Sequence, residues 1–431
     1  ELSGLVFSLE QDVTGAAEAA AEARVVELES KIATLNLELE QRRSWVFDTQ
    51  ATQWQFEVLS ELVRGAESIE RDLLAEDAVR PRLGWSMPKR IAFAETLRAG
   101  FAEGGSYSAA WAEALPAIRS AYPGLDLAPQ MGLLPIGPDP DSHLWEFAHL
   151  MSGTPARRGT DGRLALNDEV GFVLVLLPGG TFWMGAQARD PTFHNYDPNV
   201  DFDEGPVHLT ELSPFFLSKY ELTQGQWLRL TGDNPSFFRP GALDERLRVL
   251  GETPTLLHPL EQVSWDDCAT WLPRLGLALP SEAQWEFGYR AGTGTPWWTG
   301  NEKESLAGVA NLLDRFAHKH ASTFWIGVEE WLDDGAGFQQ RIGSYRPNAF
   351  GLHDVAGNVE EWCLDGYDWS FHARAPRLNP VSAGDVGDER VFRGGHYAYS
   401  ALVARASTRS NLNKSSALPT IGVRPARALE R

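Results

Sequence analysis

Cysteine is scarce in this sequence, and long apolar runs are missing. The 431 residues contain two cysteines, which excludes a disulfide-rich scaffold and a cysteine-rich zinc module. No apolar run approaches the roughly 18–20 residues that a membrane-spanning helix requires. The chain begins at Glu1, with neither an initiating methionine nor the pattern of a signal peptide. We therefore expect a cytoplasmic protein that is part of a longer chain.

Basic residues are outnumbered. Lys and Arg together number 38, against 59 Asp and Glu, so the formal net charge is -21. An acidic surface repels phosphate groups, which argues against nucleic acid and anionic membranes as partners. Hydrophobic residues make up 43% of the chain, an ordinary share for a globular protein with a sizeable core.

Residues 1–120 have a helical pattern. Apolar residues near the start alternate at spacings of three and four, which is typical of a coiled-coil seam: Val25, Leu28, Ile32, Leu35 and Leu39. About three heptads is short, so both a coiled-coil dimer and a helix packed on its own protein remain open. Further helices are predicted over residues 54–75, 89–100 and 108–121.

Proline and glycine interrupt residues 121–168, which we interpret as a connector with a short strand at 144–150. The chain then changes to short strands and tight turns. An apolar run over 172–177, the turn Pro178-Gly179-Gly180 and a second run from Thr181 together predict a β-hairpin.

Polar residues mark the starts of three helices in the second half. A helix is predicted from Thr223 to Leu230 after a plausible cap, Ser264 occupies a predicted N-cap position, and Ser281 with Gln284 has the spacing of a capping box. Two histidines, His318 and His320, are expected on a loop, where they are solvated rather than bound to a metal.

Ordered motifs are spread over residues 169–427. They include Phe182-Trp183-Met184-Gly185, Glu204-Gly205-Pro206-Val207-His208, Leu279-Pro280-Ser281-Glu282, Gly357-Asn358-Val359-Glu360-Glu361-Trp362 and Arg393-Gly394-Gly395. Together they resemble the formylglycine-generating-enzyme, or sulfatase-modifying-factor, superfamily. The resemblance implies an α+β fold: an irregular C-type-lectin-like domain over residues 169–431, preceded by the helical region.

The segment before this domain carries a second resemblance. Residues 20–168, with Trp45, Gln53-Trp54 and Leu133-Leu134-Pro135-Ile136-Gly137, are similar to the part that joins such a domain to a Ser/Thr kinase in some bacterial proteins. The sequence itself has no kinase motif. We therefore expect an upstream kinase domain, before Glu1, as a possible partner.

The metal-binding residues that the family's enzymes need for catalysis are missing from this sequence. The resemblance implies a copper-binding thiol pair a few residues after Arg393-Gly394-Gly395, because thiolates select Cu(I). Tyr399 and Ala404 stand in those places, and no cysteine follows residue 363. The iron-dependent sulfoxide synthases take three histidines largely from an N-terminal helical domain, whereas the first histidine here is His143. We expect neither copper nor iron.

The function that remains is binding without catalysis, with a metal-dependent oxidase of altered active site as the alternative. Family members diversified by retroelements carry variable side chains near the C-terminus, and Tyr, Ser and Asn suit adaptable recognition. We expect a protein or small-molecule ligand at this C-terminal cleft, although an ordinary polar loop is equally open. The predicted ligand-binding residues are Tyr397, Tyr399, Ser400, Arg405, Arg409, Asn411, Asn413 and Trp362.

The resemblance also implies structural Ca²⁺, which prefers oxygen ligands. One site would use Asp354, the carbonyls of Gly357 and Val359, and Glu361. The alternative is that Asp354 and Glu361 serve a turn and a salt bridge.

A second Ca²⁺ site would use Asn311, the carbonyl of Leu312 and Asp334. The arginines of the final third allow two interpretations, an anionic-ligand pocket or buried ties to carboxylates such as Glu286 and Glu361, and we favour the ties.

Overall fold

The structure is a computed structural model that describes residues 31, 49–69, 87–242, 253–320, 327–384 and 387–430. The chain divides into two compact units, Glu1–Ser68 and Ile69–Arg431. The first unit contributes helix α3 (Gln50–Ile69), which begins close to the predicted start. The five apolar positions of the predicted coiled-coil seam lie outside the described residues. Among the described helices, none is both long and apolar enough to cross a membrane.

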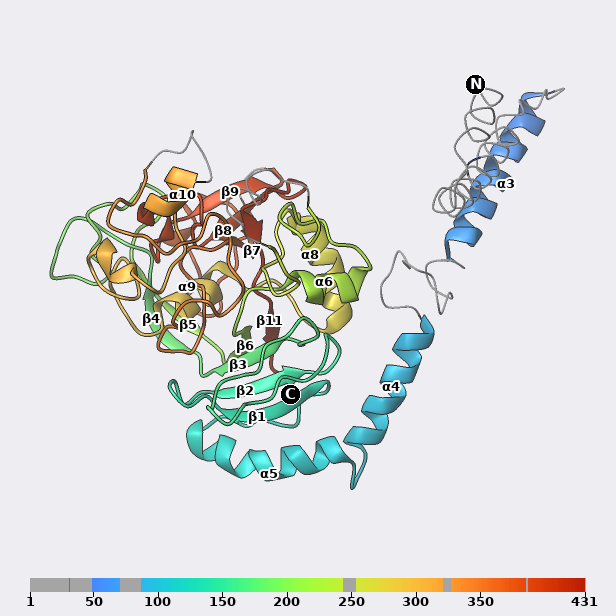
Figure 1. The fold of residues 1–431 in the computed structure, drawn as a ribbon, viewed down its shortest axis with the longest axis horizontal. Helices are drawn as coiled ribbons and strands as arrows, with labels where there is room; N and C mark the ends of the chain where they lie inside the picture. The colour runs from blue at the N-terminus through green and yellow to red at the C-terminus, as the bar shows by residue number, and fades with distance from the viewer. Residues whose placement is uncertain are drawn as a thin grey trace, which may run out of the picture. The chain divides into compact units, whose positions relative to one another are not determined.

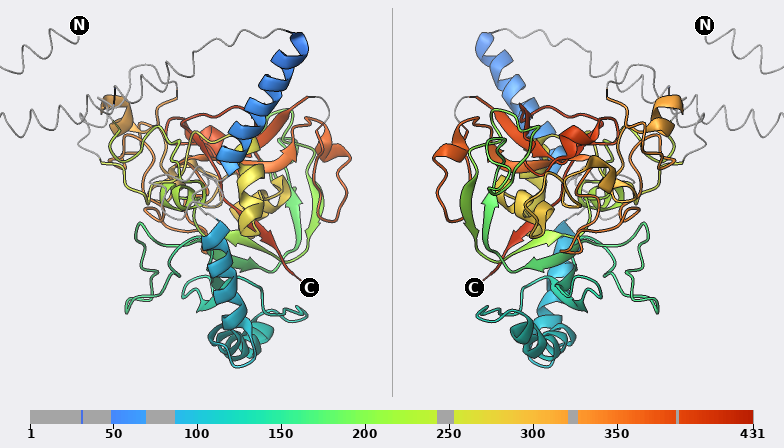
Figure 2. Two further views of the ribbon diagram at one scale, coloured as in Figure 1. Left: turned by 90° about the vertical axis from the view of Figure 1, so that its right-hand side faces the viewer. Right: turned by 90° about the vertical axis from the view of Figure 1, so that its left-hand side faces the viewer.

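The second unit begins with two predicted helices, α4 (Met87–Phe101) and α5 (Ser106–Ala121). Helix α5 lies against the first strands of the domain (Figures 1 and 2). Trp111 of α5 is fully buried, stacks on Phe147 with ring centroids 5.3 Å apart and donates a hydrogen bond to the Leu133 carbonyl. The helix is therefore attached to the sheet by packing and by a specific bond.

Five antiparallel strands form the main sheet (Figure 1). Their order is β1 (Leu133–Pro138), β2 (Trp145–His149), β3 (Val173–Leu177), β6 (Phe215–Ser218) and β11 (Ala426–Ala428). Every residue of β2, β3 and β6 is buried. Burial on both faces explains why β3 is a continuous apolar run in the sequence, whereas β2 also buries Glu146 and His149. The predicted connector thus supplies two strands of the domain's own sheet.

The segments that flank the two edge strands of this sheet meet. The side chain of Gln130 donates to the Glu430 carbonyl at 2.9 Å and accepts from the Glu430 amide at 2.8 Å. Arg427 adds a bond to the Met131 carbonyl at 2.9 Å. The stretch before β1 therefore contacts the stretch after β11, although β1 and β11 are the two edge strands of the sheet.

The remaining strands form two smaller sheets. One has the order β10 (Ile421–Gly422), β7 (Glu360–Gly366), β8 (Glu389–Arg393), β9 (Ser410–Asn413), and the other pairs β4 (Gly180–Met184) with β5 (His208–Leu212). The helices among them are short: α6 (Gln224–Thr231), α8 (Trp265–Trp271), α9 (Glu282–Arg290) and α10 (Arg315–His320). The result is a mixed α/β domain with much of its chain in loops.

The helix starts predicted from the sequence are confirmed. Thr223, Ser264 and Ser281 cap α6, α8 and α9, and each closes a reciprocal capping box with the residue three positions later. A capping box depends on residues within one turn, so its spacing is visible in the sequence.

Two predictions were wrong. Strands β3 and β4 do not form a hairpin, because β3 pairs with β2 and β6 while β4 pairs with β5. Gly179 and Gly180, at φ 67° and 111°, carry the chain from one sheet to the other. His318 and His320 lie in α10 rather than on a loop.

Candidate functional site

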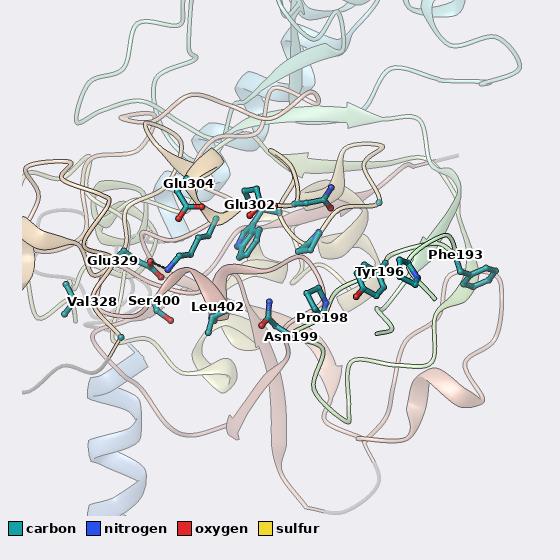
Figure 3. Close-up of a pocket in the computed structure, with 17 residues that line it drawn as sticks. Phe193, Tyr196, Pro198, Asn199, Glu302, Glu304, Val328, Glu329, Ser400 and Leu402 are labelled. Atoms are coloured by element: carbon teal, nitrogen blue, oxygen red, sulfur yellow. Dashed lines mark hydrogen bonds and ion pairs between the residues drawn. The ribbon is translucent and has the colours of Figure 1, made fainter. Parts of the chain in front are cut away.

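A cavity of about 810 Å³ lies beside the 3-10 helix η5 (Ala401–Ala404), in the segment where the resemblance would place a thiol pair (Figure 3). Three further stretches complete its walls, residues 191–199, 294–304 and 327–329. Ser400 and Leu402 contribute from the η5 side. Its size falls within the roughly 300–1,000 Å³ of small-ligand sites.

The walls combine aromatic and charged groups. Phe193 and Tyr196 lie at one end, apart from Glu302 and Glu304 (Figure 3). Trp297 and Lys303 also line the cavity. Aromatic side chains offer large contact areas, whereas charged groups orient a polar ligand. The cavity can therefore hold a ligand with both apolar and polar parts.

Glu329 fixes the frame of this cavity. Its carboxylate is buried and accepts hydrogen bonds from the Ala401 amide at 2.8 Å, the Lys303 ammonium at 2.7 Å and the Trp331 indole at 2.5 Å. Trp297 donates to the Ala401 carbonyl at 2.9 Å. Both backbone groups of Ala401 are thus held, so η5 is positioned before any ligand arrives.

The two positions that replace the thiols differ in exposure. Tyr399 is 47% exposed, and its carbonyl accepts from the Leu313 amide at 2.9 Å. Ala404 is fully buried, and its carbonyl accepts a hydrogen bond from the Tyr289 hydroxyl. A phenol and a methyl group do not offer the soft ligands that Cu(I) requires.

The chain's two cysteines lie elsewhere. Cys268 is in α8 and Cys363 is in β7, and both are buried and unpaired. Burial raises the pKa of each thiol, so neither provides a thiolate at neutral pH.

The structure separates the predicted ligand-binding residues. Ser400 lines the cavity, and Tyr399 is exposed next to it in the chain. Asn411 and Asn413 lie on β9, with Asn413 exposed. Trp362 is fully buried and donates to the Val263 carbonyl at 2.9 Å. In a separate place, Tyr397 packs edge-on against Phe238.

The arginines tie loops to carboxylates, as favoured from the sequence. Arg405 binds Asp197 and Glu204, each at 2.6 Å. Arg409 binds Glu282 at 2.6 Å. Their guanidinium groups are buried in these pairs, and neither arginine lines the cavity.

Arg393 and Arg424 form the two ties named from the sequence. Arg393 contacts Glu286 at 2.6 Å, and Arg424 contacts Glu361 at 2.7 Å. Arg393 also reaches Glu282 at 2.8 Å. Burial alone would raise the pKa of Glu282, but Arg409 and Arg393 lower it to about 2.

The environment of Asp354 fits a cation. One of its carboxylate oxygens, Oδ1, is buried without a hydrogen-bond partner, while Oδ2 accepts from the Gly343 amide at 2.7 Å. Burial and the nearby Glu361 raise the pKa of Asp354 to about 7. Glu221 lies close by, and burial, Asp354 and Glu361 raise its pKa as well. Three buried carboxyl groups thus lie near one guanidinium, which is paired with Glu361, and a bound Ca²⁺ would favour the ionised forms of Asp354 and Glu221.

The second proposed cation position fits less well. Asn311 has a buried Oδ1 without a partner, as a ligand would. Asp334, however, accepts from the Ala336 amide and the Tyr345 hydroxyl, both at 2.8 Å. Within the described ranges, no three His, Cys, Asp or Glu side chains gather closely enough to hold a metal. Both Ca²⁺ sites would therefore depend on backbone carbonyls.

Several cavity residues were not predicted as ligand-binding. Glu302, Lys303 and Glu304 look like an ordinary charged surface run in the sequence, and Glu329 lies far from the Arg393-Gly394-Gly395 motif along the chain. Trp297, one of 16 tryptophans, was not among the predicted ligand-binding residues either. Nothing local in the sequence indicates that these stretches meet at η5.

Residues 167–429 match the family described as the sulfatase-modifying factor enzyme 1-like domain. The chain belongs to this family. A formylglycine-generating enzyme of Thermomonospora curvata is 29% identical over 301 residues, which cover 58% of this chain and 92% of that protein. The serine/threonine-protein kinase pkn1 of Chlamydia pneumoniae is 26% identical over 266 residues, which cover 59% of this chain and 38% of that protein.

Solved structures of similar proteins include PvdO from Pseudomonas aeruginosa. It is 26% identical, with a TM-score of 0.48, over 61% of this chain and 96% of that one. The Treponema denticola variable protein 1 is 21% identical, with a TM-score of 0.43, over 60% of this chain and 96% of that one. Relatives of this chain are thus named both as formylglycine-generating enzymes and as serine/threonine-protein kinases.

Proposed function

We propose that this sulfatase-modifying-factor-like domain is a non-catalytic recognition module whose ligand occupies the cavity beside η5. The observation that carries the proposal is the replacement of both thiol positions by Tyr399 and Ala404. A redox metal has no soft ligand at this place, yet the cavity and its frame remain.

The frame supports a binding role. Glu329 and Trp297 hold Ala401 from both sides, so the ligand would meet a formed wall and would not have to order it. Ser400 offers a hydroxyl at the same wall, and Phe193 and Tyr196 offer apolar faces. A protein segment or a small molecule with polar and apolar parts suits these groups.

We further propose that the chain is the C-terminal part of a larger cytoplasmic signalling protein of bacteria that is linked to a kinase. The similarity to pkn1 of Chlamydia pneumoniae, which covers 38% of that protein, supports this proposal. Structural Ca²⁺ at Asp354 and Glu361, with the carbonyls of Gly357 and Val359, would stabilise the domain without taking part in catalysis. The unpartnered Oδ1 of Asp354 supports the ion.

An oxidase of altered chemistry is the alternative, because the match to a formylglycine-generating enzyme spans 92% of that protein. Oxygen consumption on a cysteine-containing peptide, measured with the full chain after incubation with Cu(I), separates the two functions. We expect no turnover and no retained copper. The double variant Tyr399→Cys/Ala404→Cys is the matched control, since it restores two thiols and should retain copper. Turnover by the unaltered chain would contradict the proposal.

Binding can be tested by blocking the cavity. A phage-displayed library of random peptides and a thermal-shift panel of metabolites would be screened against the full chain. We expect at least one ligand whose binding is lost in Leu402→Trp and kept in Leu418→Trp, since both leucines are exposed but only Leu402 lines the cavity. Failure of both screens, or binding unaffected by Leu402→Trp, would contradict the proposed site.

A further inference from the structure

Two histidines meet away from the cavity. His208 begins β5, and His372 lies in the 3-10 helix η4 (Phe371–Ala373). Their ring centroids are 4.9 Å apart, with the ring planes tilted by 50°. Chain segments separated by more than a hundred and fifty positions, which the sequence gives no reason to associate, are thus joined by two imidazoles.

Each ring uses one nitrogen and leaves the other without a partner. His208 Nδ1 lies 3.0 Å from the Pro206 carbonyl oxygen, and His372 Nδ1 lies 3.3 Å from the Glu204 carbonyl oxygen. A carbonyl only accepts, so Nδ1 carries the proton in both rings and Nε2 carries the lone pair. Both Nε2 atoms are buried without a hydrogen-bond partner.

This arrangement is the one that metal-binding histidines adopt. A backbone carbonyl on one ring nitrogen fixes the tautomer and the orientation, and the other nitrogen faces the ion. His372 is 2% exposed, so an unsatisfied nitrogen there has a cost unless something occupies it. A third unsatisfied atom is near in the strand: the hydroxyl of Thr210, two residues along β5 and on the same face as His208, is also buried without a partner.

Burial keeps the imidazole of His372 neutral. Burial, Arg409 and His208 together lower its pKa to about 4, although Glu282 and Glu286 oppose them. A neutral ring has its lone pair available at physiological pH, which a metal ligand requires.

We propose that His208 and His372 bind a late first-row transition-metal ion through their Nε2 atoms, with water in the remaining positions. Imidazole nitrogen suits Zn²⁺ and its neighbours, whereas the oxygen-rich surroundings of Asp354 suit Ca²⁺. Thr210 would hydrogen-bond a metal-bound water. The site is independent of the cavity at η5 and of the function proposed for it.

Calorimetric titration of the full chain with ZnCl₂, in the presence of CaCl₂, tests this site. The variants are His208→Asn and His372→Asn, because the asparagine amide replaces the Nδ1–H donor and removes Nε2. We expect one Zn²⁺ per chain in the unaltered protein and at least about a tenfold loss of affinity in each variant. Even changing a residue that only orients a ligand costs about 10–100-fold.

His194→Asn is the matched control, since His194 is exposed and stacks on Trp183 rather than on a second histidine. Its Zn²⁺ affinity should equal that of the unaltered chain. Melting curves without Zn²⁺ show whether the variants fold, and Zn²⁺ should raise the melting temperature of the unaltered chain and the control only. If the unaltered chain took up no Zn²⁺, or if both pair variants bound it as tightly as the unaltered chain, the two rings would be merely packed together and the proposal would be overturned.

Discussion

At the scale of single residues, this domain places charge where most proteins place only apolar groups. Arg393 and Arg424 are among its largest fully buried side chains. A loop-rich chain has few regular ladders, so its buried polar groups need other partners. Bidentate guanidinium groups supply them, because one arginine can bind two carboxylates and two carbonyls at once.

Arg393→Met should destabilise the domain by about 3–5 kcal/mol, because Glu282 and Glu286 would lose a buried partner. Arg393 also donates to the Ser407 and Ala406 carbonyls, at 3.2 and 2.7 Å. Denaturant unfolding monitored by tryptophan fluorescence measures the change. The control is Arg377→Met, whose partner Glu211 is 3.4 Å away in an exposed pair and whose loss should cost no more than about 1 kcal/mol. Equal losses in the two variants would contradict the assigned role of Arg393.

Glu360 should make the domain less stable as the pH rises from about 6.5 to 8. Burial raises the pKa of Glu360 to about 8, so the folded state keeps a proton that the unfolded chain has released. Burial lowers the pKa of His396, 4.0 Å away, to about 4, which has the opposite effect below pH 6.5. Above that pH the carboxyl acts alone in this pair.

Glu360→Gln should therefore gain stability relative to the unaltered chain between these two pH values, by at most about 2 kcal/mol. Urea unfolding at both pH values measures the difference. Gln is close in shape to protonated Glu, so the packing is kept. If the variant and the unaltered chain differed in their free energy of unfolding by the same amount at both pH values, Glu360 would not titrate between them.

At the scale of elements, the sequence predicts what neighbours in the chain decide. The cap at Ser264 and the capping box at Ser281 were recognisable because donor and acceptor lie within one turn, and the structure adds capping boxes at Thr223 and Ser264. The predicted hairpin of β3 with β4 was wrong, because β3 pairs with β2 and β6. No local sequence pattern reveals that pairing. The cavity was missed in part for the same reason, since Glu329 and the run at 302–304 meet η5 only in the folded chain.

The loop from Asp354 to Glu361 should be stabilised by Ca²⁺. Adding CaCl₂ to chelator-treated protein should raise the melting temperature. At a free Ca²⁺ concentration one hundred times the dissociation constant, the free energy of unfolding should increase by about 2.7 kcal/mol. Asp354→Ala should abolish the increase, because it removes the unpartnered oxygen. The control is Asp388→Ala, an exposed residue paired with Lys414. An equal response in both variants, or no response in the unaltered chain, would remove the site.

At the scale of the whole molecule, the matched domain and the segment before it are not separable pieces. Residues 133–149 precede the family match at 167, yet they form two strands of the same five-stranded sheet. Helix α5 is bonded to that sheet through Trp111. A boundary placed where the motifs begin would therefore cut through a folded layer.

The bonds between Gln130 and Glu430 have a consequence for how this domain can be linked to others. Strand edges are where unrelated chains join and aggregate. Here hydrogen bonds join the segment before edge strand β1 to the segment after edge strand β11. A pull on the stretch before β1 would therefore be transmitted to the stretch after β11, so that both edges of the sheet resist it together.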